Sequence, residues 1–272
     1  MHISPLPVTR DLRLAYILSL AVAILMTAAS LAGLLFPEAL YPGEDLSTAF
    51  VPNDVVNLCL GLPILLGSMA QARGGRLLGL LFWPGALLYT LYNYIAYTIA
   101  LSLSLGGLVY IVLVVLCAWA VLFLVSSMDM ATIKQRLGGL VPEKLGGGVL
   151  VGLGGLFFIM RIGVIIQTLS GQGQNRAEGS VAIADLVIMP LLVLGGVWLW
   201  QKKPLGYACG AGLLFQGSML FVGLLAIFIL QPVLLPVPFA LVDFIVVFAM
   251  GLVCFIPFGL FLRGIAGESK IP

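Results

Sequence analysis

The stretch FVPNDVVNLCLGLPILLGSMAQARGG, residues 50–75, decides the class of fold. It is an apolar run that ends in a basic turn, and Asn53, Asp54 and Asn57 stand near its start. About 20 predominantly apolar residues are enough to cross roughly 30 Å of hydrocarbon as an α-helix. The stretch therefore predicts a transmembrane helix, in which one carboxylate and two amides need a reason to be present.

The composition of the whole chain agrees with this interpretation. Of the 272 residues, 61% are hydrophobic and only 9% are charged, which is more apolar surface than a water-soluble core of this size buries. The formal net charge of +2 is too small to indicate a nucleic-acid partner, and no basic cluster is interleaved with aromatic residues. We predict an all-α integral membrane protein whose partner is the lipid bilayer, located in the plasma (inner) membrane.

Apolar runs long enough to span the bilayer number eight. We expect them at residues 12–36, 51–72, 77–101, 107–127, 147–170, 181–200, 205–230 and 239–262. If the N-terminus is cytoplasmic, 11 of the 13 lysines and arginines fall in inner segments, with Arg161 inside a span and Arg176 outside. The bias of basic residues towards the cytoplasm therefore predicts eight transmembrane helices with both termini cytoplasmic.

The chain also shows an internal similarity. Asp54 opens the second span and Asp185 the sixth, each span ends in a short basic turn, and the next helices contain GLLFWPGALLY (79–89) and GLLFQGSMLF (212–221). This pattern predicts two parallel four-helix repeats, residues 1–127 and 147–272, joined by a cytoplasmic linker at 128–146 that contains a short helix. Chance recurrence of Leu, Gly and Phe in apolar sequence is the alternative.

The ionisable and amide side chains within the spans gather in the half of the membrane that faces outward. By helical rise they lie roughly 5–14 Å from the outer ends of their spans. The candidate ligand or ion pocket consists of Asp54, Asn57, Asn93, Arg161, Asp185 and Asp243. A charged side chain on the lipid face costs roughly 2.5–3.5 kcal/mol, so we expect these groups to face the bundle interior and to meet in one pocket.

Each of these residues also has an ordinary structural interpretation. Asp54 and Asp243 could cap their helices, Arg161 could form a purely structural ion pair, and Asn93 could make an interhelical hydrogen bond. Arg161 is one positive charge against three carboxylates. A proton, water or a bound cation must therefore offset the remaining negative charge.

Other site chemistry finds little support. The single histidine, His2, lies in the N-terminal segment, and the four cysteines show no CxxC spacing, so neither a triad nor a zinc site is expected, and we expect no cofactor. The leading hypothesis is a small-solute or ion transporter with an outward-facing polar pocket. A sensor or assembly subunit that binds a ligand or partner without transporting it is the alternative, and an intramembrane enzyme is the third.

Overall fold

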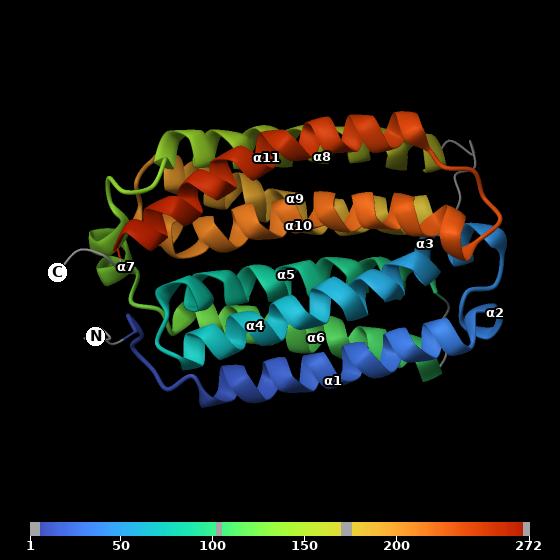
Figure 1. Cartoon of the computed structure of the whole chain (residues 1–272), viewed down its shortest axis with the longest axis horizontal. Helices are drawn as coiled ribbons and strands as arrows, with labels where there is room; N and C mark the ends of the chain where they lie inside the picture. Colours follow the sequence, from blue (N-terminus) through green and yellow to red (C-terminus); the bar gives the residue numbers. More distant parts are fainter. Residues whose placement is uncertain (1–5, 102–104, 170–175, 269–272) are drawn as a thin grey trace.

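The computed structural model describes residues 6–101, 105–169 and 176–268, and its regular structure there is helical. The elements are α1 (Arg13–Leu35), α2 (Pro37–Leu40), α3 (Glu44–Val56), the π-helical η1 (Asn57–Gly61), α4 (Leu62–Arg73), α5 (Leu77–Ala100), α6 (Leu105–Ser126), α7 (Met130–Leu137), α8 (Glu143–Leu169), α9 (Arg176–Trp200), α10 (Pro204–Leu234) and α11 (Leu241–Glu268). The long helices run side by side along one axis (Figure 1).

Seven helical stretches within the described residues are long and apolar enough to cross a membrane. They are Arg13–Leu35, Glu44–Arg73, Gly107–Ser126, Glu143–Gln167, Arg176–Trp200, Pro204–Leu234 and Leu241–Gly267. The second of them joins α3, η1 and α4 into one rod. Large apolar side chains such as Ile17, Trp119, Ile159 and Val242 are more than 60% exposed, as expected for surfaces that contact lipid rather than water. The chain is a multi-pass integral membrane protein.

The helix α5 occupies the position of the predicted span 77–101. It is 24 residues long and almost every turn of it is buried, because it lies between α4, α6, α9 and α10. It is not among the seven stretches above, and it carries four tyrosines and Asn93. Burial at the centre of the protein explains this, since a helix that other helices surround need not present an apolar surface to lipid.

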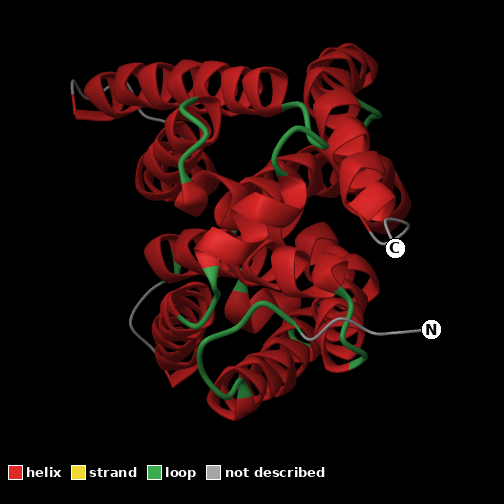
Figure 2. Ribbon diagram, turned by 90° about the vertical axis from the view of Figure 1, so that its left-hand side faces the viewer, coloured by secondary structure: helices red, strands yellow, loops and turns green. Residues whose placement is uncertain are grey.

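The helices form two groups that pack against each other (Figures 1 and 2). The first group contains α1, α3–η1–α4, α5 and α6, and the second contains α8, α9, α10 and α11. Their closest approach is between α5 and α10. A Cβ atom on Gly85 would collide with the carbonyl oxygen of Gly212, and one on Gly212 would lie 3.0 Å from the carbonyl oxygen of Leu81. Glycine at both positions is therefore what lets the two backbones touch.

Aromatic rings close the space between the two groups on one side of this crossing. Phe82 of α5 stacks on Phe215 of α10 with ring centroids 4.8 Å apart, and Phe258 of α11 lies 5.5 Å and 5.8 Å from these two rings. Phe82 lies near the start of α5, so this cluster is nearer to the end of the protein that carries the α4–α5 and α9–α10 turns (Figure 1). The start of α1 and the helix α7 lie at the same end.

The α4–α5 and α9–α10 turns have the same backbone geometry. Gly75 and Lys202 adopt the left-handed conformation, with φ of 75° and 56°. In each turn this residue donates its N–H to the carbonyl three residues earlier, and the next residue donates to the carbonyl five residues earlier, at 2.9–3.0 Å. These bonds satisfy carbonyls at the end of the first helix. Lys202 adopts a conformation that glycine takes at lower cost.

The segment between the two groups contains the short helix expected there. Asp129 caps α7, because its carboxylate accepts the backbone N–H of Thr132 at 3.1 Å and its hydroxyl at 2.7 Å. These hydrogen bonds hold the pKa of Asp129 below its usual range. Ile133 and Leu137 point into the protein and are fully buried. The helix therefore packs onto the bundle, chiefly against α10.

Candidate functional site

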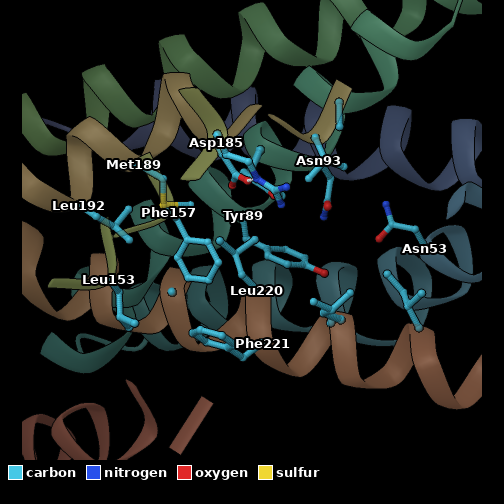
Figure 3. Close-up of a pocket in the computed structure, with 18 of the residues that line it drawn as sticks. Asn53, Tyr89, Asn93, Leu153, Phe157, Asp185, Met189, Leu192, Leu220 and Phe221 are labelled. Atoms are coloured by element: carbon cyan, nitrogen blue, oxygen red, sulfur yellow. Dashed lines mark hydrogen bonds and ion pairs between the residues drawn. The ribbon is translucent and has the colours of Figure 1, made fainter. Parts of the chain in front are cut away.

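A cavity of about 310 Å³ lies between the two helix groups. Residues of α3, α5, α8, α9, α10 and α11 line it (Figure 3). Its polar groups are the side chains of Asn53, Tyr89, Tyr92, Asn93, Arg161, Asp185 and Gln231. A cavity of this volume, mostly apolar and with a few convergent polar groups, has the properties of a small-molecule site.

The charged part of the cavity is an ion pair between neighbouring helices. Arg161 of α8 and Asp185 of α9 approach to 2.5 Å between Nε and Oδ2. The Asp185 side chain is 4% exposed and the Arg161 side chain 22%. The Tyr92 side chain, from α5, lies near the carboxylate. Asp185 is thus buried and paired with Arg161, while part of the guanidinium remains accessible.

Most of the remaining cavity surface is apolar. Leu153 and Phe157 of α8, Met189 and Leu192 of α9, and Phe221 of α10 enclose the part shown on the left of Figure 3. Asn53 and Asn93 lie at the other side of the same view. One molecule in the cavity would therefore contact amides and charges at one part and hydrocarbon at another, which suits an amphipathic ligand.

The walls of the cavity differ in exposure. Most lining residues contributed by α5 and α9, such as Asn93 and Met189, are buried. Several of those contributed by α8 and α10 are partly exposed, including Leu153 and Phe157, and Leu224 is 39% exposed. The cavity therefore borders the outer surface of the protein between α8 and α10, where a membrane protein meets lipid.

Asp54 does not line this cavity, which corrects the expected grouping with Arg161. Its side chain is 1% exposed and accepts hydrogen bonds from the hydroxyls of Tyr41 at 2.6 Å and Tyr97 at 2.9 Å. A Cβ atom on Gly33 of α1 would collide with the same carboxylate. Hydroxyl donors thus satisfy the Asp54 carboxylate, and Arg161 pairs with Asp185 on the adjacent helix α9.

Depth in the protein also differs from expectation. The helix α3 begins at Glu44, seven residues before the predicted span, so Asp54 lies about 15 Å inside it. Asp185, nine residues after the start of α9, lies about 13 Å inside its helix. Asp243 is an exposed residue in the first turn of α11, outside the cavity lining. There its charge complements the helix dipole.

The two asparagines of the predicted pocket contact each other. Nδ2 of Asn93 donates to Oδ1 of Asn57 at 3.2 Å. Asn93 lines the cavity, whereas Asn57 lies behind it, is 1% exposed, and has no hydrogen-bond partner for Nδ2 among the described residues. Asn57 also begins the π-helical turn η1, and such turns occur frequently at functional sites.

Sequence reasoning missed several polar residues of this region. Tyr41 lies in the loop before α3, and nothing in the sequence connects it with Asp54. Gln231 lies one residue beyond the predicted end of the seventh span, yet its amide lines the cavity and donates to the carbonyl of Thr48 at 3.1 Å. Gln216 is fully buried with both amide atoms unpaired among the described residues. Its position near the middle of the predicted seventh span favoured a packing contact over a ligand contact.

Comparison with known proteins identifies no relative for this chain: no family model, no curated protein and no solved structure matches it. Within the described residues, no group of three or more His, Cys, Asp or Glu side chains is placed to hold a metal ion. The site is thus described by the chemistry of its own side chains, which are an ion pair, three amides, two tyrosines and an apolar wall.

Proposed function

We propose that the protein is a membrane transporter that binds a small amphipathic solute in the cavity between its two helix groups. The observation that carries this proposal is the cavity itself, because it combines the Arg161–Asp185 pair and Asn93 with a hydrocarbon wall at membrane depth. Polar and ionisable groups inside a membrane protein are costly and characteristically mark substrate or ion pathways.

The two similar turns support an internal repeat, with a register that differs from the one suggested by the aromatic motifs. Gly75 and Lys202 are 127 residues apart, and so are Gly85 and Gly212, which face each other at the α5–α10 crossing. A two-fold axis along the membrane normal brings equivalent residues of parallel repeats together in this way. Phe82 and Phe215, which the motifs paired, are 133 apart and stack directly on each other.

We further propose that α5 is an eighth span and that both chain ends are cytoplasmic. In support, the turns after α4 and α9, the helix α7 and the start of α1 all lie at one end of the protein (Figure 1). This end carries most of the basic residues, including Arg73, Arg76, Lys134 and Lys202. Reporter fusions test the orientation: an external signal from the α7 segment would overturn it.

The state of the structure fits a transporter that is closed towards the cytoplasm. The Gly85–Gly212 contact and the cluster of Phe82, Phe215 and Phe258 separate the cavity from the end that carries the basic turns. Alternating access would require the aromatic cluster to open while the two helix groups rock about the Gly85–Gly212 contact. A ligand sensor or assembly subunit is the second candidate, because such a protein needs the cavity but never opens the inner contacts.

The experiment is a thermal-shift screen of the purified protein with small carboxylates, amines and zwitterions, followed by liposome flux of each stabilising compound. Leu153→Trp fills the cavity, and Leu156→Trp, on the exposed face of the same helix, is the matched control. We expect the first variant alone to abolish both the shift and the flux. Ligand binding that both variants retain would contradict the site. Binding without flux would favour the sensor.

A further inference from the structure

The surroundings of Asp54 form a second polar site within the first helix group. The carboxylate is 1% exposed, and no ion pair to it exists among the described residues. The titratable groups that face it are all tyrosines: Tyr41 before α3, Tyr94 and Tyr97 of α5, and Tyr110 of α6. The neighbouring part of α1 presents Ser30 and Gly33. An ionised carboxylate here has hydroxyl donors but no opposite charge.

Tyr97 has two acceptors for one proton. Its hydroxyl oxygen lies 2.9 Å from Oδ1 of Asp54 and 3.3 Å from the backbone carbonyl oxygen of Phe50. It also accepts a hydrogen bond from Nδ2 of Asn53 at 3.3 Å. Because a tyrosine hydroxyl donates one hydrogen bond at a time, the choice between the two acceptors depends on whether Asp54 needs a donor.

Both protonation states of Asp54 therefore fit the same heavy-atom positions. When Asp54 is ionised, Tyr97 donates to Oδ1. When a proton from water is bound at Oδ1, the new Asp54 O–H donates to the Tyr97 oxygen, and the Tyr97 O–H turns to the carbonyl of Phe50. Every buried polar atom of this set remains hydrogen-bonded in either state, so a change in the charge of Asp54 leaves no donor or acceptor unpaired.

The same hydrogen bonds connect Asp54 to the cavity. Phe50 and Asn53 are cavity-lining residues, and both contact the Tyr97 hydroxyl. The π-helical turn starts at Asn57, three residues after Asp54, and a local widening of the helix is a place where its register can change. A change in the Tyr97 hydrogen bond is thus transmitted to two atoms of the cavity wall.

We propose that Asp54 is a proton-binding site that exchanges a proton with the aqueous phase, and that Tyr97 reports its state to Phe50 and Asn53. Proton binding at Asp54 does not depend on the transport proposal. Only its role as a coupling site for the solute rests on that proposal. Desolvation disfavours an isolated charge at this depth, and the tyrosines allow the neutral form without leaving a donor or acceptor unpaired.

The test is infrared difference spectroscopy of the lipid-reconstituted protein during pH steps. A protonated carboxyl has a carbonyl-stretching band that an ionised one lacks. We expect a band that titrates in the wild type, is lost in Asp54→Asn, and is retained in the control Asp243→Asn at the exposed start of α11. Survival of that band in Asp54→Asn, or no titrating band while the protein stays folded, would overturn the proposal.

Tyr97→Phe provides a second measurement that does not require Asp54 to be changed. This variant removes the acceptor of the Asp54 O–H, so the band is expected to persist at a shifted frequency. An unshifted band would overturn the exchange of hydrogen bonds at Tyr97. A titrating Asp54 band in a protein that shows no solute flux would confirm the proton site while contradicting the transporter, so the two proposals fail separately.

Discussion

Removing either partner of the ion pair between α8 and α9 should destabilise the fold, but by different amounts. Loss of Arg161, as in Arg161→Met, leaves Asp185 as a nearly fully buried carboxylate without its charged partner. Loss of the acid, as in Asp185→Leu, leaves Arg161 with a side chain that is already 22% exposed. Its long stem can carry the guanidinium towards the interface. We therefore expect Arg161→Met to destabilise the fold more.

The magnitudes follow from burial. Removing one partner of a buried pair costs about 3–5 kcal/mol, which we expect for Arg161→Met. For Asp185→Leu we expect about 1–3 kcal/mol, the range for leaving a partly accessible polar group without its partner. The double variant replaces both charges with apolar groups and should lie within about 1 kcal/mol of the wild type, since such replacements are often neutral. The double variant is thus expected to lose much less unfolding free energy than the sum of the losses in the two single variants.

The measurement is the free energy of unfolding of the detergent-solubilised protein, titrated with a denaturing detergent and followed by far-UV circular dichroism. Arg13→Met is the control, because Arg13 forms a highly exposed pair with Asp11 at 3.2 Å. Exposed pairs contribute little, so this variant should unfold like the wild type. Additive effects in the double variant, or a larger loss from Asp185→Leu than from Arg161→Met, would refute the reasoning.

Three further predictions concern packing and capping. Gly85→Ala should cost about 1–3 kcal/mol of unfolding free energy because its methyl group meets the backbone of the facing helix. In Gly148→Ala the added methyl group points into open space, so this variant should be neutral or more stable by about 0.4–1 kcal/mol. Equal losses of unfolding free energy in Gly85→Ala and Gly148→Ala would contradict this prediction. Gly33→Ala should displace the Asp54 carboxylate, at a cost of about 1–3 kcal/mol of unfolding free energy. The displacement should also shift the infrared band of Asp54, and an unchanged band would argue against the contact. Hydrogen bonds from Thr132 lower the pKa of Asp129. The cap therefore stabilises α7 at neutral pH, and this stabilisation is lost as the pH falls through the lowered pKa. Hydrogen exchange at the Thr132 amide, corrected for the intrinsic pH dependence of exchange, should accelerate in that pH range.

The sequence predicted the membrane class and most of the spans because apolar length leaves few alternatives. It placed the start of the second span too late. The residues 44–50 include Glu44, Asp45, Ser47 and Thr48, which indicate a loop by composition, yet α3 begins there with both acids in its first turn. Acids at a helix N-terminus are favourable, so polarity at that position marked the beginning of the helix rather than the end of a loop.

The part of the candidate site that the sequence predicted is the part in which electrostatics allows only one pairing of charges. Arg161 and Asp185 carry opposite charges on consecutive helices, and they pair as such charges must inside a membrane. The partners of Asp54 were not predictable in the same way. A carboxylate accepts hydrogen bonds from any donor, and the donors are Tyr41 and Tyr97, separated from it by 13 and 43 residues. Only the folded arrangement identifies them.

The position of the Gly85–Gly212 contact determines how far each side of the protein moves in any rocking of the two helix groups. As a fulcrum it divides α5 unequally, with 15 residues, about 22 Å, on the arm towards Ala100 and eight residues, about 12 Å, on the arm towards Leu77. A rotation of about 10° moves the Ala100 end by about 4 Å but the Leu77 end by only about 2 Å. A gap at the Leu77 end wide enough for the proposed solute would therefore require nearly twice that displacement at the Ala100 end, which would collapse the cavity as the end with the α4–α5 and α9–α10 turns opens.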